Sequence, residues 1–80
     1  MQTKTLKIFC DLAETKSFSK TAQINNLSQP AITQQIKTLE QELNVNLIDK
    51  QSKMFKLTKH GEIVLAYAKT TLAEYFSLIE

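Results

Sequence analysis

Apolar positions between residues 28 and 43 follow the period of a helix. Four aliphatic residues recur three or four positions apart, which predicts one apolar face: Ile32, Ile36, Leu39 and Leu43. Ser28 suits the N-cap of this helix, and Pro30 falls in its first turn, where a missing N–H is harmless. The pattern therefore predicts a helix over about residues 29–43 that buries a single stripe.

The opposite side of the 29–43 helix has a composition that suits a DNA groove. Its first two turns carry neutral polar or basic residues, whereas the acids come later, at Glu40 and Glu42. Glutamine pairs with adenine, and the methyl group of threonine or the ring of proline can touch the thymine methyl. We therefore predict base contacts from Gln29, Pro30, Thr33, Gln34 and Lys37.

The preceding segment supplies the partner of this helix. Ser17 or Ser19 can cap a short helix that runs through Ala22 and ends at the helix breakers Asn25 and Asn26. A connection this short forces the two helices to cross steeply. The arrangement is that of a helix-turn-helix unit, whose second helix enters the major groove.

A wing is predicted after the 29–43 helix. Ile48, Met54, Phe55 and Leu57 flank a polar turn at residues 50–53, which favours a short two-stranded ribbon. Its lysines would reach phosphates or the neighbouring minor groove, or else the hairpin would only cover the core. The predicted DNA backbone contacts come from the short helix, the cap of the 29–43 helix and the wing. They are Ser17, Ser19, Lys20, Ser28, Lys50 and Lys53.

The chain from Thr58, a suitable N-cap, reads as one helix to the last residue. Its apolar residues alternate spacings of three and four, as in a coiled coil, and a second strip beside them widens the apolar surface. One small core cannot cover both strips, so we expect a homodimer through this helix. The predicted dimer interface comprises Ile63, Val64, Leu65, Tyr67, Ala68, Leu72, Tyr75 and Ile79.

These elements define the fold class and the domain organisation. We expect an all-α dominated winged helix-turn-helix with a short two-stranded β wing and a long C-terminal dimerisation helix. Residues 1–58 would form the DNA-binding domain and residues 59–80 a linker helix. The 80 residues bury only about 60% of their unfolded surface, so a partner subunit would help. The apolar pattern is unfinished at Glu80, which indicates a longer protein.

Charge changes this picture only through its distribution. The formal net charge is +2, which is modest for a protein that binds nucleic acid. Residues 50–59 hold four lysines and no acid, a run that a solvated surface would also show. Because this lysine run follows the 29–43 helix, it favours DNA binding over an ordinary solvated surface. All ten basic residues are lysine, so the chain lacks the bidentate contact that arginine makes to guanine. We therefore expect the DNA target to be rich in A·T pairs.

Other chemistry finds little support in the sequence. Cys10 is the only cysteine, so we interpret it as a small core residue, with redox sensing as the alternative. His60 has no second histidine or cysteine at ligand spacing, so we expect no metal and no cofactor. Asp11 and Glu14 form a carboxylate pair without a nucleophile, so we expect no enzyme. No apolar run approaches a membrane span, so we expect a cytoplasmic protein with no membrane partner.

Several separated motifs carry a family resemblance. They are Ser17-Phe18-Ser19-Lys20-Thr21-Ala22, residues 27–33, residues 36–40, Leu43 and residues 57–61. From about Leu6 to Gly61 they resemble, in register, the LysR-type transcriptional regulators. The chain departs from the usual family residues at four places. It has Lys16 and Asn44 where the family usually has glycine, Asn25 where it usually has leucine, and Ile48-Asp49-Lys50 where it usually has Phe-x-Arg.

The resemblance implies a winged helix-turn-helix that continues through a linker helix into a two-lobed effector-binding domain. It also implies that the family positions equivalent to Gln29, Pro30, Thr33 and Gln34 contact bases. We therefore expect sequence-specific binding of double-stranded DNA by a bacterial transcriptional regulator, at an interrupted inverted repeat. The alternative is a winged-helix module that binds another protein and no DNA. Structured RNA is a weaker option, because the aromatic residues fall on core stripes.

Overall fold

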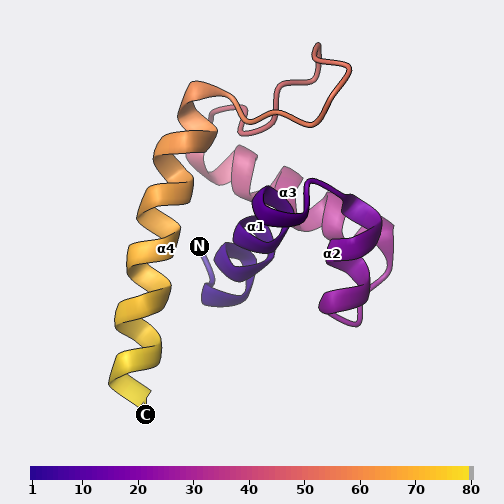
Figure 1. The fold of residues 1–80 in the computed structure, drawn as a ribbon. Coiled ribbons are helices and arrows are strands. Elements are labelled where there is room, and N and C mark those ends of the chain that lie inside the picture. The colour runs from indigo at the N-terminus through magenta and orange to yellow at the C-terminus, as the bar shows by residue number, and fades with distance from the viewer. Residues whose placement is uncertain (80) are drawn as a thin grey trace.

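Three short helices and one long helix make up the regular structure in residues 1–79, the part of the chain that this computed structural model describes (Figure 1). The helices are α1 (Thr3–Thr15), α2 (Phe18–Ile24), α3 (Gln29–Leu43) and α4 (Lys59–Ile79). Helix α1 contacts each of the other three. Helices α2 and α4 lie on opposite sides of it, and the loop between α3 and α4 projects at the top of Figure 1. The architecture is the mostly helical, winged helix-turn-helix type.

The main core lies between α1 and α3. Ile8, Phe9 and Leu12 of α1 are completely buried. They meet Ile32, Ile36 and Leu39, three of the four aliphatic residues that predicted the apolar face of α3, while Leu43 is partly buried at the edge. The predicted stripe of α3 is therefore confirmed.

Helix α4 packs against α1 through a second, smaller cluster. Leu6 of α1 meets Ala68 and Leu72 of α4, with Cys10 partly buried beside them. Ala68 and Leu72, both in the predicted dimer interface, are 0% and 8% exposed within the single chain, because they pack against α1. Helical spacing marks an apolar face but does not tell whether that face meets its own chain or another.

The ends of the helices are set as the sequence predicts. Ser17 and Ser28 cap α2 and α3 by accepting the backbone N–H of Lys20 and Ala31. The Thr58 hydroxyl accepts the N–H of Gly61 at 3.0 Å in the first turn of α4. Asn44 ends α3 in the left-handed conformation, at φ 55°. The predicted N-caps and the C-terminal asparagine of α3 are therefore confirmed.

The predicted two-stranded wing is not confirmed. In the described part of the chain, residues 44–58 form a loop with one antiparallel bridge, between Ile48 and Leu57. The N–H of Asp49 donates to the Lys56 carbonyl at 2.8 Å, but its side chain then accepts the N–H of Gln51 and turns the chain away. This local turn competes with a longer ladder of paired strands. The wing is therefore a loop closed at its base.

Candidate nucleic-acid interface

The predicted base-contacting residues lie together on one exposed face of α3. Gln29, Pro30, Thr33 and Gln34 line an open hollow of about 530 Å³, and Lys37 continues the same exposed side. The Thr33 hydroxyl donates to the Gln29 carbonyl at 3.2 Å, and the Gln34 amide donates to the Thr38 hydroxyl at 3.2 Å. These contacts stay on the helix itself, so the polar groups remain open to a partner.

The exposure of this face follows from what α3 buries. Ile32 is fully buried and Ile36 is nearly so, both on the opposite side of the helix. Because these side chains anchor α3 in the core, the first two turns hold Thr33 and Gln34 outwards. The core thus holds α3 so that its polar face is presented to solvent.

Four of the predicted backbone contacts lie at the starts of α2 and α3. Ser19 and Lys20 are exposed, and Ser17 is partly buried because it caps α2. Ser28 is exposed and caps α3, with its Oγ 3.2 Å from the Ala31 nitrogen. Within residues 1–79, Lys20 takes part in no ion pair, so its charge is available to a phosphate.

The two predicted lysines of the wing differ in their surroundings. Lys53 is exposed at the loop and makes no ion pair with any described residue. Lys50 lies 3.4 Å from the carboxylate of Glu40, although most of its side chain is exposed. Lys53 is thus the freer of the two for a phosphate contact, and Lys50 also helps to hold the wing against α3.

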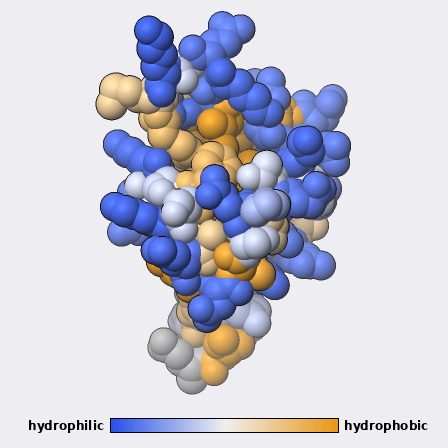
Figure 2. Space-filling model, turned by 90° about the vertical axis from the view of Figure 1, so that its right-hand side faces the viewer, coloured by the Kyte–Doolittle hydropathy of each residue, from blue (hydrophilic) through white to orange (hydrophobic). Residues whose placement is uncertain are grey.

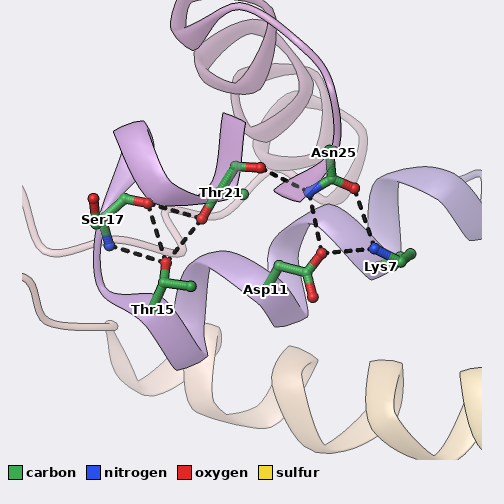
Figure 3. Close-up of polar contacts among 6 residues, drawn as sticks. All are labelled: Lys7, Asp11, Thr15, Ser17, Thr21 and Asn25. Carbon is green, nitrogen blue, oxygen red and sulfur yellow. Dashed lines mark hydrogen bonds and ion pairs between the residues drawn. The ribbon is translucent and has the colours of Figure 1, made fainter. Parts of the chain in front are cut away.

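A polar cluster joins α1 to the turn that follows α2 (Figure 3). The ammonium group of Lys7 lies 2.8 Å from Asp11 Oδ2 and 3.2 Å from Asn25 Oδ1. Asn25 Nδ2 donates to Asp11 Oδ2 at 3.1 Å and to the Thr21 carbonyl at 2.9 Å. We call Lys7, Asp11 and Asn25 the Asn25 cluster. Sequence reasoning missed it, although the departure at Asn25 from the usual leucine was a signal.

A second cluster joins the end of α1 to the first turns of α2 (Figure 3). The hydroxyls of Thr15 and Thr21 lie 2.9 Å apart, and Thr21 also donates to the Ser17 carbonyl at 2.8 Å. The N–H of Ser17 donates to the Thr15 hydroxyl at 3.1 Å. Each hydroxyl of this Thr21 cluster, formed by Thr15, Ser17 and Thr21, therefore has a partner close to the start of α2.

The remaining candidates for chemistry are dispersed. Residues 1–79 contain no group of three histidine, cysteine, aspartate or glutamate side chains placed to hold a metal ion. Burial, with Asp11 adding to it, raises the pKa of the Cys10 thiol, and Lys69 opposes this shift in part. Asp11 is held by Lys7 and Asn25, while Glu14 is exposed. No described helix has the length and apolar character needed to cross a membrane.

Comparison with known proteins identifies the family. Residues 3–62 match the bacterial regulatory helix-turn-helix proteins of the lysR family. The chain belongs to the LysR family. Among its LysR-family relatives is the transcriptional activator IlvY of Haemophilus influenzae, 41% identical over 70 residues that cover 88% of this chain and 24% of IlvY. The regulator AlsR of Bacillus subtilis is 36% identical over 80 residues, all of this chain and 26% of AlsR.

Solved LysR-family structures share the fold. The BenM DBD in complex with catB site 1 DNA matches with a TM-score of 0.92 and 30% identity, over 99% of this chain and 89% of that one. Vibrio fischeri DarR in complex with DNA matches with a TM-score of 0.93 and 33% identity, over 99% of this chain and 27% of DarR. The chain thus spans about a quarter of the length of the full-length LysR-family relatives named here.

Proposed function

We propose that the chain is the DNA-binding domain of a LysR-family transcriptional regulator and binds double-stranded DNA in a sequence-specific way. The observation that carries this proposal is the exposed polar face of α3, held outwards by Ile32 and Ile36. Support comes from the similarity of the fold to the BenM and DarR DNA complexes. The relatives are named as transcriptional regulators, and we propose no enzymatic activity.

We divide the contacts with DNA into two groups. Phosphate contacts fix the orientation of a protein on the duplex, and contacts to base edges specify sequence. Helix α3 enters the major groove with Gln29, Pro30, Thr33, Gln34 and Lys37 at the bases. The backbone contacts are Ser17, Ser19, Lys20, Ser28, Lys50 and Lys53. Glutamine and threonine at the bases, with lysine in place of arginine, favour A·T-rich half-sites.

We further propose a homodimer through α4, with residues 1–58 forming the DNA-binding unit and α4 the linker. Several large apolar side chains of α4 are exposed in the single chain: Ile63, Tyr67, Tyr75, Phe76, Leu78 and Ile79. Figure 2 shows hydrophobic side chains at the lower end of the molecule, where α4 extends beyond the other helices. Two subunits would bind an interrupted inverted repeat with recognition helices roughly 34 Å apart. An effector-binding domain would follow α4 in a cytoplasmic regulator.

Selection of sequences from a random duplex pool tests the assignment of base contacts. The purified chain should enrich a half-site, and Gln34→Ala should lower its affinity for that duplex by about 1 to 3 kcal/mol. The matched control is Gln41→Ala, since Gln41 is exposed on the same helix, two turns beyond Gln34, and is not one of the residues that we assign to the bases. Equal weakening of selected and random duplexes by Gln34→Ala would show that Gln34 does not contact bases.

Titration at several salt concentrations tests the backbone contacts. Lys53→Ala should weaken binding to all sequences and reduce the slope of log affinity against log salt by about 1. A chain that acted only as a protein-binding module would show no such salt-dependent binding to duplex DNA. That result would overturn the proposed function as a whole.

A further inference from the structure

Helix α2 owes little of its position to apolar packing. Of its seven residues, only Thr21 and Ala22 are buried, and Thr21 is polar. Phe18, at the start of the helix, is only partly buried against the main core. Because hydrophobic stabilisation grows with the apolar area removed from water, α2 gains little from these contacts. Hydrogen bonds therefore add to the packing of Ala22 and Phe18 in holding α2 in place.

Those hydrogen bonds join α2 to α1 at both of its ends. The Thr21 cluster holds the start of α2, and the Asn25 cluster holds its end (Figure 3). The Asn25 cluster is the stronger candidate for a specific role, because its bonds involve the charged groups of Lys7 and Asp11. Hydrogen bonds to ionised groups are in general stronger than those between neutral groups, although the bonds of Asn25 to Lys7 and Asp11, at 3.2 and 3.1 Å, are longer than those of the Thr21 cluster.

We propose that Asn25 is a positioning residue for DNA recognition, which holds the end of α2 on α1. It thereby keeps the phosphate-contacting residues of α2 in register with the base-contacting face of α3. This inference rests on the proposed function.

The amide of Asn25 is suited to this place because it both donates and accepts. Its nitrogen donates to the Asp11 carboxylate and to the Thr21 carbonyl, and its oxygen accepts from Lys7. A leucine, the usual family residue, would make none of these bonds. An aspartate would keep an acceptor for Lys7 but would set a second carboxylate beside Asp11. It would also remove the side-chain donor to the Thr21 carbonyl, which would keep only the backbone N–H of residue 25.

The consequence for DNA binding follows from how α3 is held. The buried side chains of Ile32 and Leu39 fix α3 in the core independently of the Asn25 cluster. Between Asn25 and α3 the chain passes through Asn26, which has a left-handed conformation at φ 53°, and the Ser28 cap. We therefore expect breaking the cluster to move the end of α2 relative to α3, while α3 stays in place.

A specific complex must satisfy phosphate and base contacts at the same time, because phosphate contacts set the register of the helix on the bases. A non-specific complex has no base register to satisfy. Displacement of α2 should therefore weaken binding to a selected sequence more than binding to random DNA.

The test compares Asn25→Asp with Asn26→Asp. Both variants add one negative charge to the same turn, but Asn26 is exposed and lies outside the cluster. Dissociation constants are measured for a duplex selected by the unaltered chain and for the random pool, at a temperature where circular dichroism shows each variant folded. We expect Asn25→Asp to lower the random-to-selected ratio of dissociation constants by about tenfold, and Asn26→Asp to change it by less than about twofold.

A second pair covers the case in which Asn25→Asp does not fold. Asp11→Asn removes the carboxylate of the cluster, and Glu14→Gln removes an exposed carboxylate from the same helix. We expect only Asp11→Asn to lower the ratio. A purely structural role would lower the melting temperature and leave the ratio for the folded protein unchanged.

The two proposals fail in different ways. Equal ratios for Asn25→Asp and Asn26→Asp, or for Asp11→Asn and Glu14→Gln, would overturn the positioning role while the unaltered chain still prefers its selected duplex. An unaltered chain with no preference for any duplex would overturn the proposed function, and this inference with it.

Discussion

The carboxylate of Glu40, in the last turn of α3, accepts the backbone N–H of Leu47 at 2.8 Å. Both residues are buried, Leu47 completely. The other carboxylate oxygen of Glu40 lies 3.4 Å from the ammonium group of Lys50. The Glu40 side chain thus ties α3 to Leu47 and Lys50, at the start of the wing.

Glu40→Ala should lower the free energy of unfolding by about 1 to 3 kcal/mol, because it leaves the buried N–H of Leu47 without an acceptor. Glu40→Gln keeps an acceptor oxygen and loses only the ion pair with the exposed Lys50, so it should cost less than about 1 kcal/mol. Urea denaturation measures both values. The matched control is Glu42→Ala, whose partner is the exposed amino terminus. A cost for Glu40→Ala no larger than that of Glu42→Ala would contradict this account.

Gly61→Ala should destabilise the chain, contrary to the usual effect in a helix. An added Cβ would overlap the Leu47 carbonyl oxygen and lie 3.1 Å from the Leu57 Cβ. Overpacking of this kind costs about 1 to 3 kcal/mol, whereas alanine in place of an unhindered helical glycine gains about 0.5 to 1 kcal/mol. The sign of the change in melting temperature is therefore decisive. A rise would show that α4 does not approach Leu47 as closely as described.

Lys16→Gly should have the opposite effect. Lys16 ends α1 in the left-handed conformation, at φ 57°, where a side chain costs about 1 to 2 kcal/mol and glycine costs nothing comparable. Allowing for the greater freedom of glycine in the unfolded chain, we expect a net gain of about 0.5 to 1 kcal/mol in unfolding free energy. Lys16→Ala removes the charge but keeps the Cβ, so it should gain little. Equal gains in unfolding free energy for the two variants would mean that the loss of the charge, and not the backbone conformation, causes the effect.

Features that depend only on residues close together in the sequence were predicted correctly. The caps at Ser17, Ser28 and Thr58 and the end of α3 at Asn44 are local, and the structure confirms them. The exposed face of α3 followed from the spacing of its buried residues. Lys16 and Asn44, both noted as departures from glycine, adopt the left-handed conformation that glycine favours.

Features that depend on how distant segments meet were not predicted. Lys7 and Asp11 lie one helical turn apart, but their contact with Asn25 requires the crossing of α1 and α2. The spacing of Ala68 and Leu72 marked an apolar face without showing that α1 covers it. Apolar residues on both sides of a polar turn favoured a ribbon at the wing, where the side-chain turn at Asp49 left one bridge.

Tyr67→Glu should disrupt the dimer that we propose. Tyr67 is 53% exposed and lines, with Met1, Leu43, Ile63 and Val64, an apolar groove of about 330 Å³. Aromatic residues in apolar grooves often dominate interface energies, and a buried unpaired carboxylate is costly. Sedimentation equilibrium should show the dissociation constant of the dimer rising at least about tenfold, which is about 1.4 kcal/mol.

The matched control for this prediction is Ala66→Glu. Ala66 is exposed on the same helix and precedes Tyr67, so the added charge is the same, but it lies outside the apolar groove. Because Tyr67 is not part of the core of the single chain, Tyr67→Glu should leave the helical content unchanged while it shifts the association. An equal shift by both variants would mean that the subunits meet through another surface, and the face formed by Ile63 and Tyr67 would then need a different partner.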